Sequence, residues 1–282
     1  MNSKKPIIIV NNVAYSYSTD SKALINANLN IYPGEILGVM GKNGAGKTTL
    51  IRTFNGLIRP TKGNIFINGE NIKSKTIAQL SAKVGIIFQN PSLQLFSNTV
   101  EDEIKFSLNS LDLGTQELEE RTEYFLDLFN LKKYRDRSPL NLSGGETKKL
   151  AIASIICRDP EILVFDEPTL GQDAKEIKFF IDLITAQKEK GKTIIIVTHN
   201  IEFAIEHIPR IILMADGKII ADGPTDKLLT NQQLIRKTSL VLPQVHKFCL
   251  ELKKSGIECP ENILLKDEMF QFLSDFLKKQ KI

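Results

Sequence analysis

The feature that most limits the possible folds is a glycine-rich octapeptide that follows a short apolar run. Residues 41–48 read Gly-Lys-Asn-Gly-Ala-Gly-Lys-Thr and fit the pattern G-x-x-x-x-G-K-[ST]. The run Ile36–Met40 before it has the length of a strand, and a helix is expected to begin near Lys47. In such a unit, backbone N–H groups surround phosphates and the lysine adds a positive charge. The octapeptide therefore predicts a nucleotide-binding α/β fold, with Lys47 at the β- and γ-phosphates and Thr48 as a ligand of Mg²⁺.

Two adjacent carboxylates follow a second apolar run. The run Ile162–Phe165 is followed by Asp166 and Glu167. Taken alone, this pair suits a solvated strand end. Next to a phosphate loop, however, the aspartate can hold hydrated Mg²⁺ and the glutamate can orient or deprotonate water.

A third motif combines a helix start with two glycines. Ser143 and Glu146 have the S-x-x-E spacing of a capping box, which closes a helix N-terminus. Gly144 and Gly145 are costly in a first helical turn, and they make sense if the backbone approaches a ligand closely. Because a helix N-terminus attracts anions, the chain is predicted to carry two half-sites for one nucleotide.

The remaining pattern predicts a parallel sheet with a helical insertion. Continuous apolar runs at Val84–Phe88 and Ile194–Val197 are typical of strands covered on both faces. An early strand is expected around Val10 to Tyr17 and a late hairpin over residues 211–221. Between residues 92 and 160 the pattern is mostly helical, with predicted helices at Leu118–Phe129 and Lys148–Cys157. We expect one domain over residues 1–237 and a small helical extension over residues 238–282.

The predicted extension contains two amphipathic helices. Pro243 suits the first turn of one helix and Gly256 its C-terminal cap. Two short helices cannot bury their apolar stripes alone, so these need the main domain or another chain. The stripes are Val245, Phe248, Cys249 and Leu252 in the first helix, and Met269, Phe272, Leu273, Phe276 and Leu277 in the second.

Composition narrows the functional classes. The chain has 282 residues, 42% of them hydrophobic, and a net charge of +4, which does not favour nucleic acid as a partner. Its apolar runs are too short to span a membrane and its N-terminus lacks the apolar region of a secretory signal, so any membrane contact is expected through partners. Cys157, Cys249 and Cys259 form no C-x-x-C pair and are expected to be free thiols.

Together with the pair Thr198-His199, these motifs resemble the ATPase subunit of ABC transporters over residues 7–235. The resemblance implies a RecA-like core with a helical subdomain and an antiparallel β part. It also implies that two subunits pair head to tail, with each ATP between the phosphate loop of one and the Ser-Gly-Gly turn of the other.

The resemblance assigns roles residue by residue. Gln89 matches the glutamine that senses Mg²⁺ and the attacking water, Glu167 the general base, and His199 the switch histidine at the γ-phosphate. Tyr17 matches the aromatic residue that stacks on adenine, with Tyr15 as the competing candidate. The catalytic residues are then Glu167, His199, Gln89 and Lys47, and the metal ligands Thr48, Gln89 and Asp166. The nucleotide-binding residues are Tyr17, Gly41, Asn43, Gly44, Ala45, Gly46, Lys47, Thr48, Thr49, Ser143, Gly144, Gly145, Glu146 and Asp173.

A second resemblance points to one branch. Residues 88–91 (Phe-Gln-Asn-Pro), 94–96 (Gln-Leu-Phe) and 99–103 (Thr-Val-Glu-Asp-Glu) are similar to energy-coupling-factor ATPases, as is the tail from Leu240. This implies an ATPase pair on the cytoplasmic face of the membrane, a transmembrane scaffold, a membrane substrate-binding subunit, and uptake of a vitamin or transition-metal ion. Residues 238–282 would then be a dimerisation extension.

Several residues depart from the family pattern, and other functions stay open. Glu146 stands where glutamine is usual, Thr147-Lys148-Lys149 follow it, and Gln172 replaces an apolar residue. A carboxylate at position 146 would be unfavourable near the γ-phosphate unless it turns back to the Ser143 backbone. The changes suit one member of a heterodimer with unequal sites.

Three alternative functions stay open. They are a soluble ABC-type ATPase acting on ribosomes or DNA, an ATPase of another ABC branch, and a regulatory module without catalysis.

Overall fold

A central six-stranded sheet organises the chain, which a computed structural model describes over residues 5–18, 21–260 and 263–279. The strand order is β10-β9-β3-β8-β7-β6, and only β9 and β10 pair antiparallel. The early strand, the four apolar runs and the late hairpin predicted from the sequence are all present. The strands of this sheet are β3 (Ile36–Met40), β6 (Val84–Ile87), β7 (Ile162–Asp166), β8 (Thr193–Val197), β9 (Arg210–Ala215) and β10 (Lys218–Pro224).

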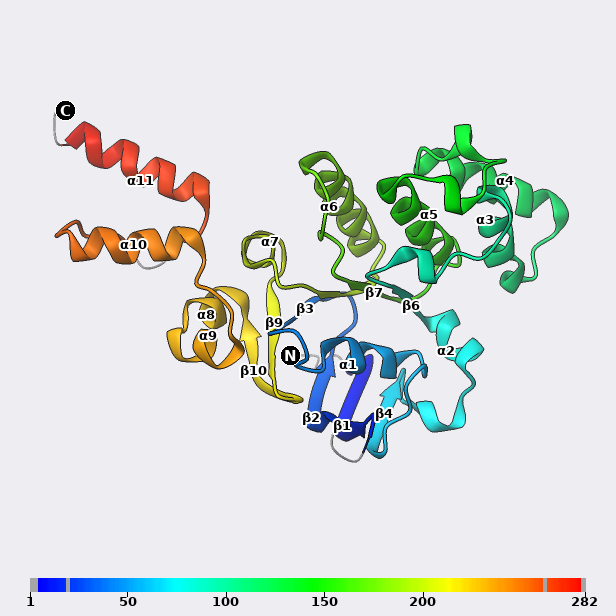
Figure 1. The fold of residues 1–282 in the computed structure, drawn as a ribbon, viewed down its shortest axis with the longest axis horizontal. Coiled ribbons are helices and arrows are strands. Elements are labelled where there is room, and N and C mark those ends of the chain that lie inside the picture. Colours follow the sequence, from blue (N-terminus) through cyan, green and yellow to red (C-terminus); the bar gives the residue numbers. More distant parts are fainter. Residues whose placement is uncertain (1–4, 19–20, 261–262, 280–282) are drawn as a thin grey trace.

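The parallel strands are continuously apolar because each of their faces belongs to a different core. In β7, Leu163 and Phe165 pack into one buried cluster with residues of the surrounding helices. Ile162 and Val164 point the opposite way, into a second cluster shared with the antiparallel sheet and α1 (Lys47–Phe54). Figure 1 shows these two coverings on opposite sides of the central strands. Both faces are therefore shielded from water, as the apolar runs predicted.

A second, antiparallel sheet covers one face of the central sheet. Its strand order is β2-β1-β4-β5, and β1 runs antiparallel to both of its neighbours. The fold is thus the predicted P-loop α/β core with an antiparallel β part. The strands are β1 (Ile8–Ser16), β2 (Lys22–Ile31), β4 (Lys62–Ile67) and β5 (Glu70–Asn71).

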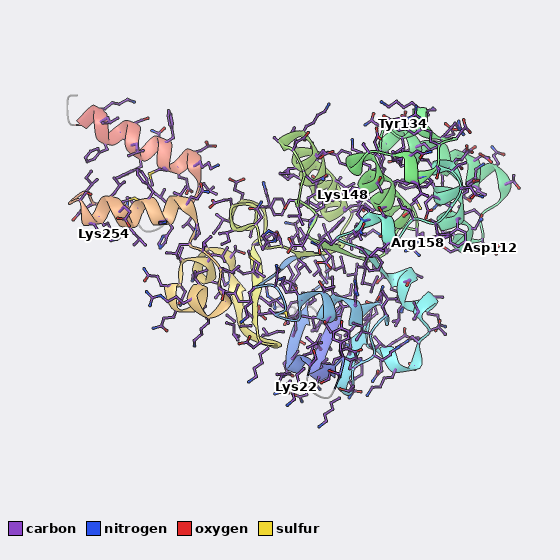
Figure 2. The ribbon with its side chains drawn as sticks, in the orientation of Figure 1. Lys22, Asp112, Tyr134, Lys148, Arg158 and Lys254 are labelled. Atoms are coloured by element: carbon purple, nitrogen blue, oxygen red, sulfur yellow. A yellow bond between two sulfur atoms is a disulfide. The ribbon has the colours of Figure 1, made fainter. Side chains whose placement is uncertain are left out.

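A group of helices is inserted between β6 and β7, as the sequence predicted. These are α3 (Val100–Leu108), α4 (Thr115–Leu128) and α5 (Gly144–Ile156), joined by short 3₁₀ turns. The predicted start of α5 at Lys148 was too late, because Ser143 caps the helix and both glycines are inside it. In Figure 2, Tyr134 in this group and Lys22 in the antiparallel sheet lie at opposite edges of the molecule. The remaining helices of the core are α2 (Ile77–Lys83), α6 (Ala174–Glu189) and α7 (Ile201–His207).

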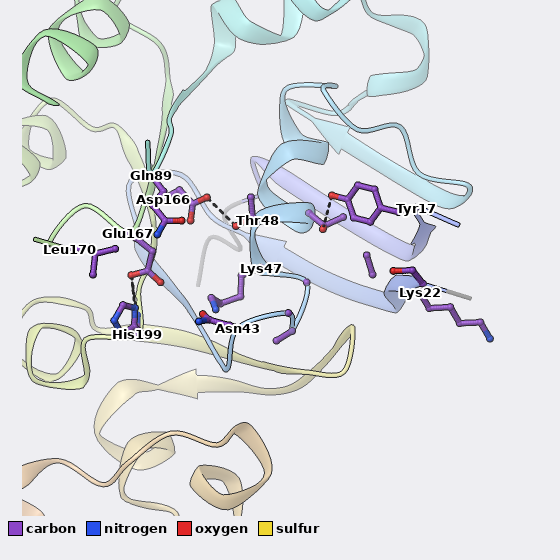
Figure 3. A pocket seen from close by; sticks show the side chains of 16 residues that line it. Tyr17, Lys22, Asn43, Lys47, Thr48, Gln89, Asp166, Glu167, Leu170 and His199 are labelled. Atoms are coloured by element: carbon purple, nitrogen blue, oxygen red, sulfur yellow. Dashed lines mark hydrogen bonds and ion pairs between the residues drawn. The ribbon is translucent and has the colours of Figure 1, made fainter. Parts of the chain in front are cut away.

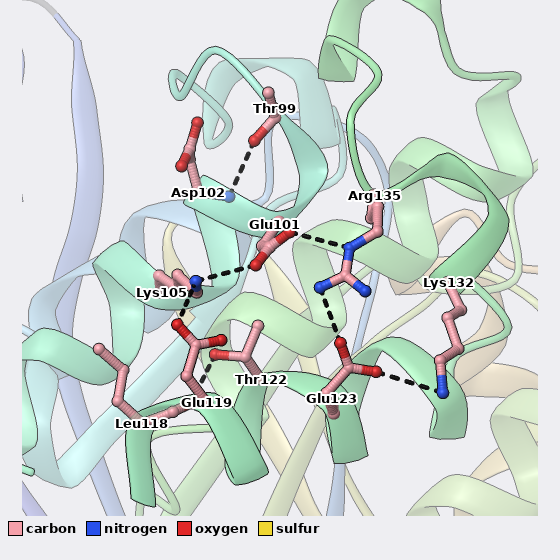
Figure 4. Close-up of polar contacts among 10 residues, drawn as sticks. All are labelled: Thr99, Glu101, Asp102, Lys105, Leu118, Glu119, Thr122, Glu123, Lys132 and Arg135. Carbon is pink, nitrogen blue, oxygen red and sulfur yellow. Dashed lines mark hydrogen bonds and ion pairs between the residues drawn. The ribbon is translucent and has the colours of Figure 1, made fainter. Parts of the chain in front are cut away.

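Ion pairs join the inserted helices at their surface (Figure 4). Glu101 of α3 accepts from Lys105 at 2.8 Å and from Arg135 at 2.9 Å. Lys105 and Arg135 reach on to α4, where they pair with Glu119 at 2.6 Å and Glu123 at 2.7 Å. Hydrogen bonds from Arg135 and Lys105 lower the pKa of Glu101 to about 2 from its usual 4.5. Glu101 is therefore the charge on which the α3–α4 network depends.

We expect this network to make stability depend on pH. A carboxylate with a lowered pKa stabilises the folded state above its unfolded pKa of 4.5, and this stability is lost as pH falls through about 2. Glu101→Gln should lower the free energy of unfolding at pH 6 by about 2 kcal/mol, allowing for solvent screening. Urea unfolding at pH 6 and pH 3 should show the gap to the unmodified protein narrowing at the lower pH, whereas a constant gap would contradict the network's role. Glu120→Gln, on an exposed position of α4, is the control.

The C-terminal helices pack on each other. The chain continues through α8 (Thr225–Thr230) and α9 (Gln232–Thr238) into α10 (Gln244–Lys254) and α11 (Lys266–Lys279). Val245, Cys249 and Met269 are buried in a cluster of their own between α10 and α11. This packing covers part of the predicted stripes, whereas Phe248 and Leu277 stay 45% and 50% exposed. Glu202 of α7 accepts a hydrogen bond from the backbone N–H of Gln244 at 2.9 Å, which ties this unit to the core.

The expectation of three free thiols was wrong for two of the cysteines. Cys249 and Cys259 are joined as a disulfide, with Cα atoms 5.4 Å apart. The loop after α10 turns back on the helix. Cys249 and Cys259, whose sequence separation is 10, therefore come within bonding range without forming a C-x-x-C motif. Cys157 is free and buried, and burial raises the pKa of its thiol to about 12. Within residues 5–18, 21–260 and 263–279, no helix is long and apolar enough to span a bilayer.

Candidate functional site

A pocket of about 570 Å³ opens where the phosphate loop meets the carboxyl ends of β6, β7 and β8 (Figure 3). The motifs from four separate stretches of the sequence converge there, as expected for a parallel sheet whose strands end at one edge. Of the predicted site residues, Tyr17, Asn43, Gly44, Ala45, Gly46, Lys47, Thr48, Thr49, Gln89, Asp166, Glu167 and His199 line this pocket.

The phosphate loop needs glycine at two places where other backbone comes close. A Cβ atom on Gly41 would lie 2.1 Å from the carbonyl oxygen of Met214, and one on Gly46 would lie 2.3 Å from that of Ala23. Gly46 is also the N-cap of α1, and no side chain caps its first turn. The backbone N–H groups at the start of α1 are therefore available to an anion.

Lys47 is held inside the loop as a buried cation. Its ammonium group donates to the carbonyl oxygens of Gly41 at 2.8 Å and Lys42 at 3.1 Å. Burial lowers the pKa of Lys47, while the carboxylates of Glu167 and Asp166 act in the opposite direction. A desolvated ammonium group at a bare helix start gives the pocket a strong preference for phosphate.

The predicted metal ligands meet at one side of the pocket. The Thr48 hydroxyl donates to Asp166 Oδ2 at 3.0 Å, and Gln89 borders the same space. Burial is the largest influence on Asp166 and raises the pKa of its carboxyl group. Hydroxyl, carboxylate and amide oxygens are the hard donors that Mg²⁺ takes, and a cation there would favour the ionised form of Asp166. These residues therefore fit Mg²⁺ that is shared with phosphate oxygens.

Glu167 and His199 form a hydrogen-bonded pair at the pocket. The ring Nδ1 of His199 lies 2.9 Å from Glu167 Oε2. Glu167 is buried and has a positive φ of 52°, a left-handed conformation that costs energy for a residue with a side chain. Its backbone N–H donates to Val197 of β8 at 2.9 Å, which holds this conformation. The arrangement points one carboxylate into a phosphate-binding space, as a general base requires.

The structure favours Tyr17 over Tyr15 as the base-stacking residue. Tyr17 lines the pocket with 58% of its surface exposed, and its hydroxyl lies 3.1 Å from Thr49 Oγ1. Tyr15 packs against the buried cluster beneath the antiparallel sheet and meets the Tyr17 ring edge-on, with centroids 5.0 Å apart. Tyr17 thus offers a ring supported by its neighbour, and stacking on adenine remains a prediction.

Six predicted nucleotide-binding residues do not line this pocket. The carbonyl oxygen of Gly41 accepts a hydrogen bond from the Lys47 ammonium group. Ser143, Gly145 and Glu146 lie at the start of α5, and Asp173 lies at the start of α6. Asp173 caps α6, and its side chain accepts from the backbone N–H of Glu176 at 2.8 Å. Gly144 borders a separate pocket of about 380 Å³, whose wall also includes Gln89 and Leu170. Within one chain, the Ser143 turn therefore does not close the phosphate pocket.

The capping box at the Ser143 turn explains how Glu146 is tolerated. Glu146 Oε2 accepts from the backbone N–H of Ser143 at 2.8 Å, and the Ser143 hydroxyl accepts from Glu146 N at 3.4 Å. The carboxylate therefore turns back on its own helix, as the sequence required of it. Hydrogen bonds from Tyr134 and Ser143 lower the pKa of Glu146 to about 2. The side chain is charged at neutral pH and stabilises the helix start.

Replacing the Glu146 carboxylate by an amide is not expected to lower ATP turnover. Glu146→Gln keeps the capping oxygen and removes a negative charge beside a predicted anion site, so ATP turnover should stay equal or rise up to about threefold. The rate of phosphate release by the assembled complex measures this. A large loss of turnover would refute our account of Glu146.

Sequence reasoning missed several residues at the pocket. Ser21, Lys22 and Ala23 line it because β2 pairs with β1 and brings its first residues to the base-binding end. No motif marks this stretch, so only the strand pairing reveals it. Lys148 of α5, labelled in Figure 2, lines the neighbouring pocket that Gly144 borders, and burial lowers its pKa to about 8. The sequence marked it only as a departure from the family pattern.

The chain is similar to ATP-binding subunits of transporters. The family described as ABC transporter matches residues 24–170. A protein of Methanosarcina acetivorans, named as an ABC transporter ATP-binding protein without further assignment, is 37% identical over 97% of this chain, but the chain spans only 44% of it. The energy-coupling factor transporter ATP-binding protein EcfA1 of Caldanaerobacter subterraneus is 36% identical over 95% of this chain and 98% of that protein.

Two solved structures resemble the fold. Structure comparison matches cbiO1 from Clostridium perfringens, part of the ABC transporter complex cbiONQ, with a TM-score of 0.72 and 32% identity over 90% of this chain and 98% of that one. A dimeric ATP-binding cassette in a post-hydrolysis state with ADP and Pi matches with a TM-score of 0.70 and 28% identity over 77% of this chain and 98% of that one.

Proposed function

This chain belongs to the ABC transporter family, and we propose that it binds and hydrolyses ATP to drive uptake of a vitamin or transition-metal ion as a subunit of an energy-coupling-factor transporter. The observation that carries the catalytic part is the convergence of Lys47, Asp166 and the Glu167–His199 pair in one pocket. Support for the transporter branch comes from the relatives named for energy-coupling factors, which match the chain nearly end to end. The transported substrate is inferred from the branch alone.

The reaction we propose is the in-line attack of water on the γ-phosphate. His199 Nδ1 lies 2.9 Å from Oε2 of Glu167, so the other carboxylate oxygen would be left to accept the proton of the water. Lys47 and the N–H groups of α1 would bind the phosphate oxygens and stabilise their developing charge. Mg²⁺, held by Thr48, Asp166 and Gln89, would neutralise charge on the phosphates.

We propose that a second ABC ATPase subunit, either another copy or a related chain, completes the site. Residues 143–146 do not line the phosphate pocket of their own chain, and Gly144 borders a separate pocket instead. Pairing head to tail would bring the Ser143 turn of one subunit to the pocket of the other. ATP binding would then draw the subunits together and hydrolysis would release them.

Contact with the membrane is proposed to run through other subunits at the cytoplasmic face. Leu93 and Phe96, in the segment that follows Gln89, and Phe106 of α3 are exposed apolar side chains. Such a patch suits a helix of a transmembrane scaffold, which would carry the motion of the ATPase pair to a substrate-binding membrane subunit. Helices α10 and α11 would add to the contact between the two ATPases.

Purification from membranes tests the transporter assignment. A tagged chain expressed in its own cell and extracted in mild detergent should bring along a scaffold and a substrate-binding membrane subunit. Recovery of ribosomes or DNA instead would support the soluble ATPase, and a complex lacking those membrane subunits would indicate another ABC branch. Either result would refute the assignment to an energy-coupling-factor transporter. Neither would bear on ATP hydrolysis, which a separate assay of phosphate release measures.

A further inference from the structure

A single side chain joins the end of β6 to the middle of α5. The Gln94 amide donates from Nε2 to the carbonyl oxygen of Ala151 at 2.7 Å and to Ser154 Oγ at 3.2 Å. Its Oε1 lies 3.5 Å from the backbone N of Phe88, a long contact on the accepting side. Phe88 directly precedes Gln89, and α5 begins at the Ser143 turn. Gln94 thus contacts both elements that carry the two halves of the proposed ATP site.

A buried carboxylate fastens the same segment to α3. Glu103 is only 1% exposed, and its Oε2 accepts from the backbone N–H groups of Phe96 at 3.0 Å and Ser97 at 2.9 Å. Burying a carboxylate is costly unless hydrogen bonds replace its water, and here two backbone donors do so. The segment 94–97 is therefore held from within by polar bonds to two helices.

The side chains that the stretch 93–96 turns outward are apolar and exposed. Leu93 is 76% exposed and Phe96 is 66% exposed, and the ring of Phe96 meets that of Phe106 edge-on with centroids 4.7 Å apart. A force on these apolar side chains acts on a stretch whose inner side is bonded to α3 and α5. Because α5 is a continuous helix, its N-terminal turn moves with the residues that Gln94 contacts.

We infer that Gln94 and Glu103 are positioning residues for ATP hydrolysis, because they hold the segment 89–97, which begins with Gln89, and the Ser143 turn in a fixed relation. The inference rests on the proposed function. Neither residue lines the phosphate pocket, so neither contacts the nucleotide. Their loss lets Gln89 and the Ser143 turn move separately, which lowers the fraction of bound ATP that reaches the reactive geometry.

The test uses the full chain in its assembled complex. Gln94→Met removes the donors with little change in length, and Gln116→Met makes the same change at an exposed glutamine of α4. We expect Gln94→Met to lower kcat about tenfold with KM for ATP within twofold, and Gln116→Met to change neither. Gln94→Glu, which keeps the accepting oxygen and loses the donors, should lower kcat similarly and decides the matter if Gln94→Met does not fold.

Glu103 is tested by rescue and by exchange of particular amides. Glu103→Gln keeps one oxygen for both N–H groups and should retain most of kcat, whereas Glu103→Leu should lose it. Hydrogen exchange on the isolated full chain should be faster at Phe96 and Ser97 in Glu103→Leu, but not in Glu103→Gln.

Three results would overturn the inference. They are a normal kcat in both Gln94 variants, a change confined to KM, and unchanged exchange at Phe96 and Ser97 in Glu103→Leu. An unmodified complex without ATPase activity would instead refute the proposed function, and the positioning role would fall with it. The exchange measurement would still show whether Glu103 holds the segment.

Discussion

Glu167→Gln is expected to reduce ATP turnover by at least about 100-fold while ATP binding stays within about twofold, because a positioned general base contributes roughly 10²–10⁴ to a rate. The amide fills the same space and can still contact His199, whose Nδ1 lies 2.9 Å from the carboxylate in the unmodified chain. It cannot take a proton from water. Phosphate release under saturating ATP measures the turnover, and titration calorimetry measures the binding.

The matched control is the same substitution at the opposite end of the same strand. Glu161 directly precedes β7 and its carboxylate accepts from the Asn68 amide at 2.6 Å, far from the pocket. Glu161→Gln should leave turnover unchanged. If Glu167→Gln kept more than a tenth of the unmodified rate, water would be activated by another group and the role assigned to Glu167 would be wrong.

Lys47→Met should weaken ATP binding by about 100-fold, since hydrogen bonds from a charged group contribute about 1.5–3 kcal/mol and each 1.4 kcal/mol is a factor of ten. The ammonium group is buried in the loop, so water does not replace it at the phosphates. The affinity is measured by calorimetry with Mg-ATP. Thermal unfolding of the variant checks that the loop has not collapsed, because Gly41 and Lys42 lose a hydrogen-bond donor.

Lys42, in the same loop, provides a control that separates the effect of where Lys47 places its charge from the effect of losing any positive charge. Lys42 belongs to the same loop, but its side chain pairs with Asp216 at 2.9 Å and does not line the pocket. Lys42→Met removes the same charge from the same loop and should change the affinity less than threefold. Equal losses in the two variants would show that overall charge, and not the placement of Lys47, governs binding.

The core strands could be predicted because each is buried on both faces, which produces an uninterrupted apolar run such as Ile194–Val197. Strands β2 and β4 were not predicted, since their faces alternate between core and solvent and their apolar residues are spaced apart. The self-packing of α10 and α11 was missed because it depends on how the loop between them turns, which brings Cys249 to Cys259.

The site residues likewise include some that the sequence could predict and others that it could not. Residues that act within a motif, such as Lys47 and Thr48, could be assigned from their spacing because the phosphate loop has a local conformation. Ser21–Ala23 could not, since strand pairing alone brings them to the pocket. The bonds of Gln94 and Glu103 were also invisible, because polar side chains directed inward have no periodic pattern.

The central claim is that the phosphate pocket of one ATPase subunit is completed by the Ser143 turn of another. Light scattering on the Glu167→Gln chain, alone or mixed with its partner ATPase, gives the mass of the particle that holds Mg-ATP. We predict a particle of two ATPase subunits that forms with Mg-ATP and dissociates when the nucleotide is removed. A single subunit that remains monomeric with its pocket saturated, and protects the γ-phosphate without a second chain, would contradict the claim.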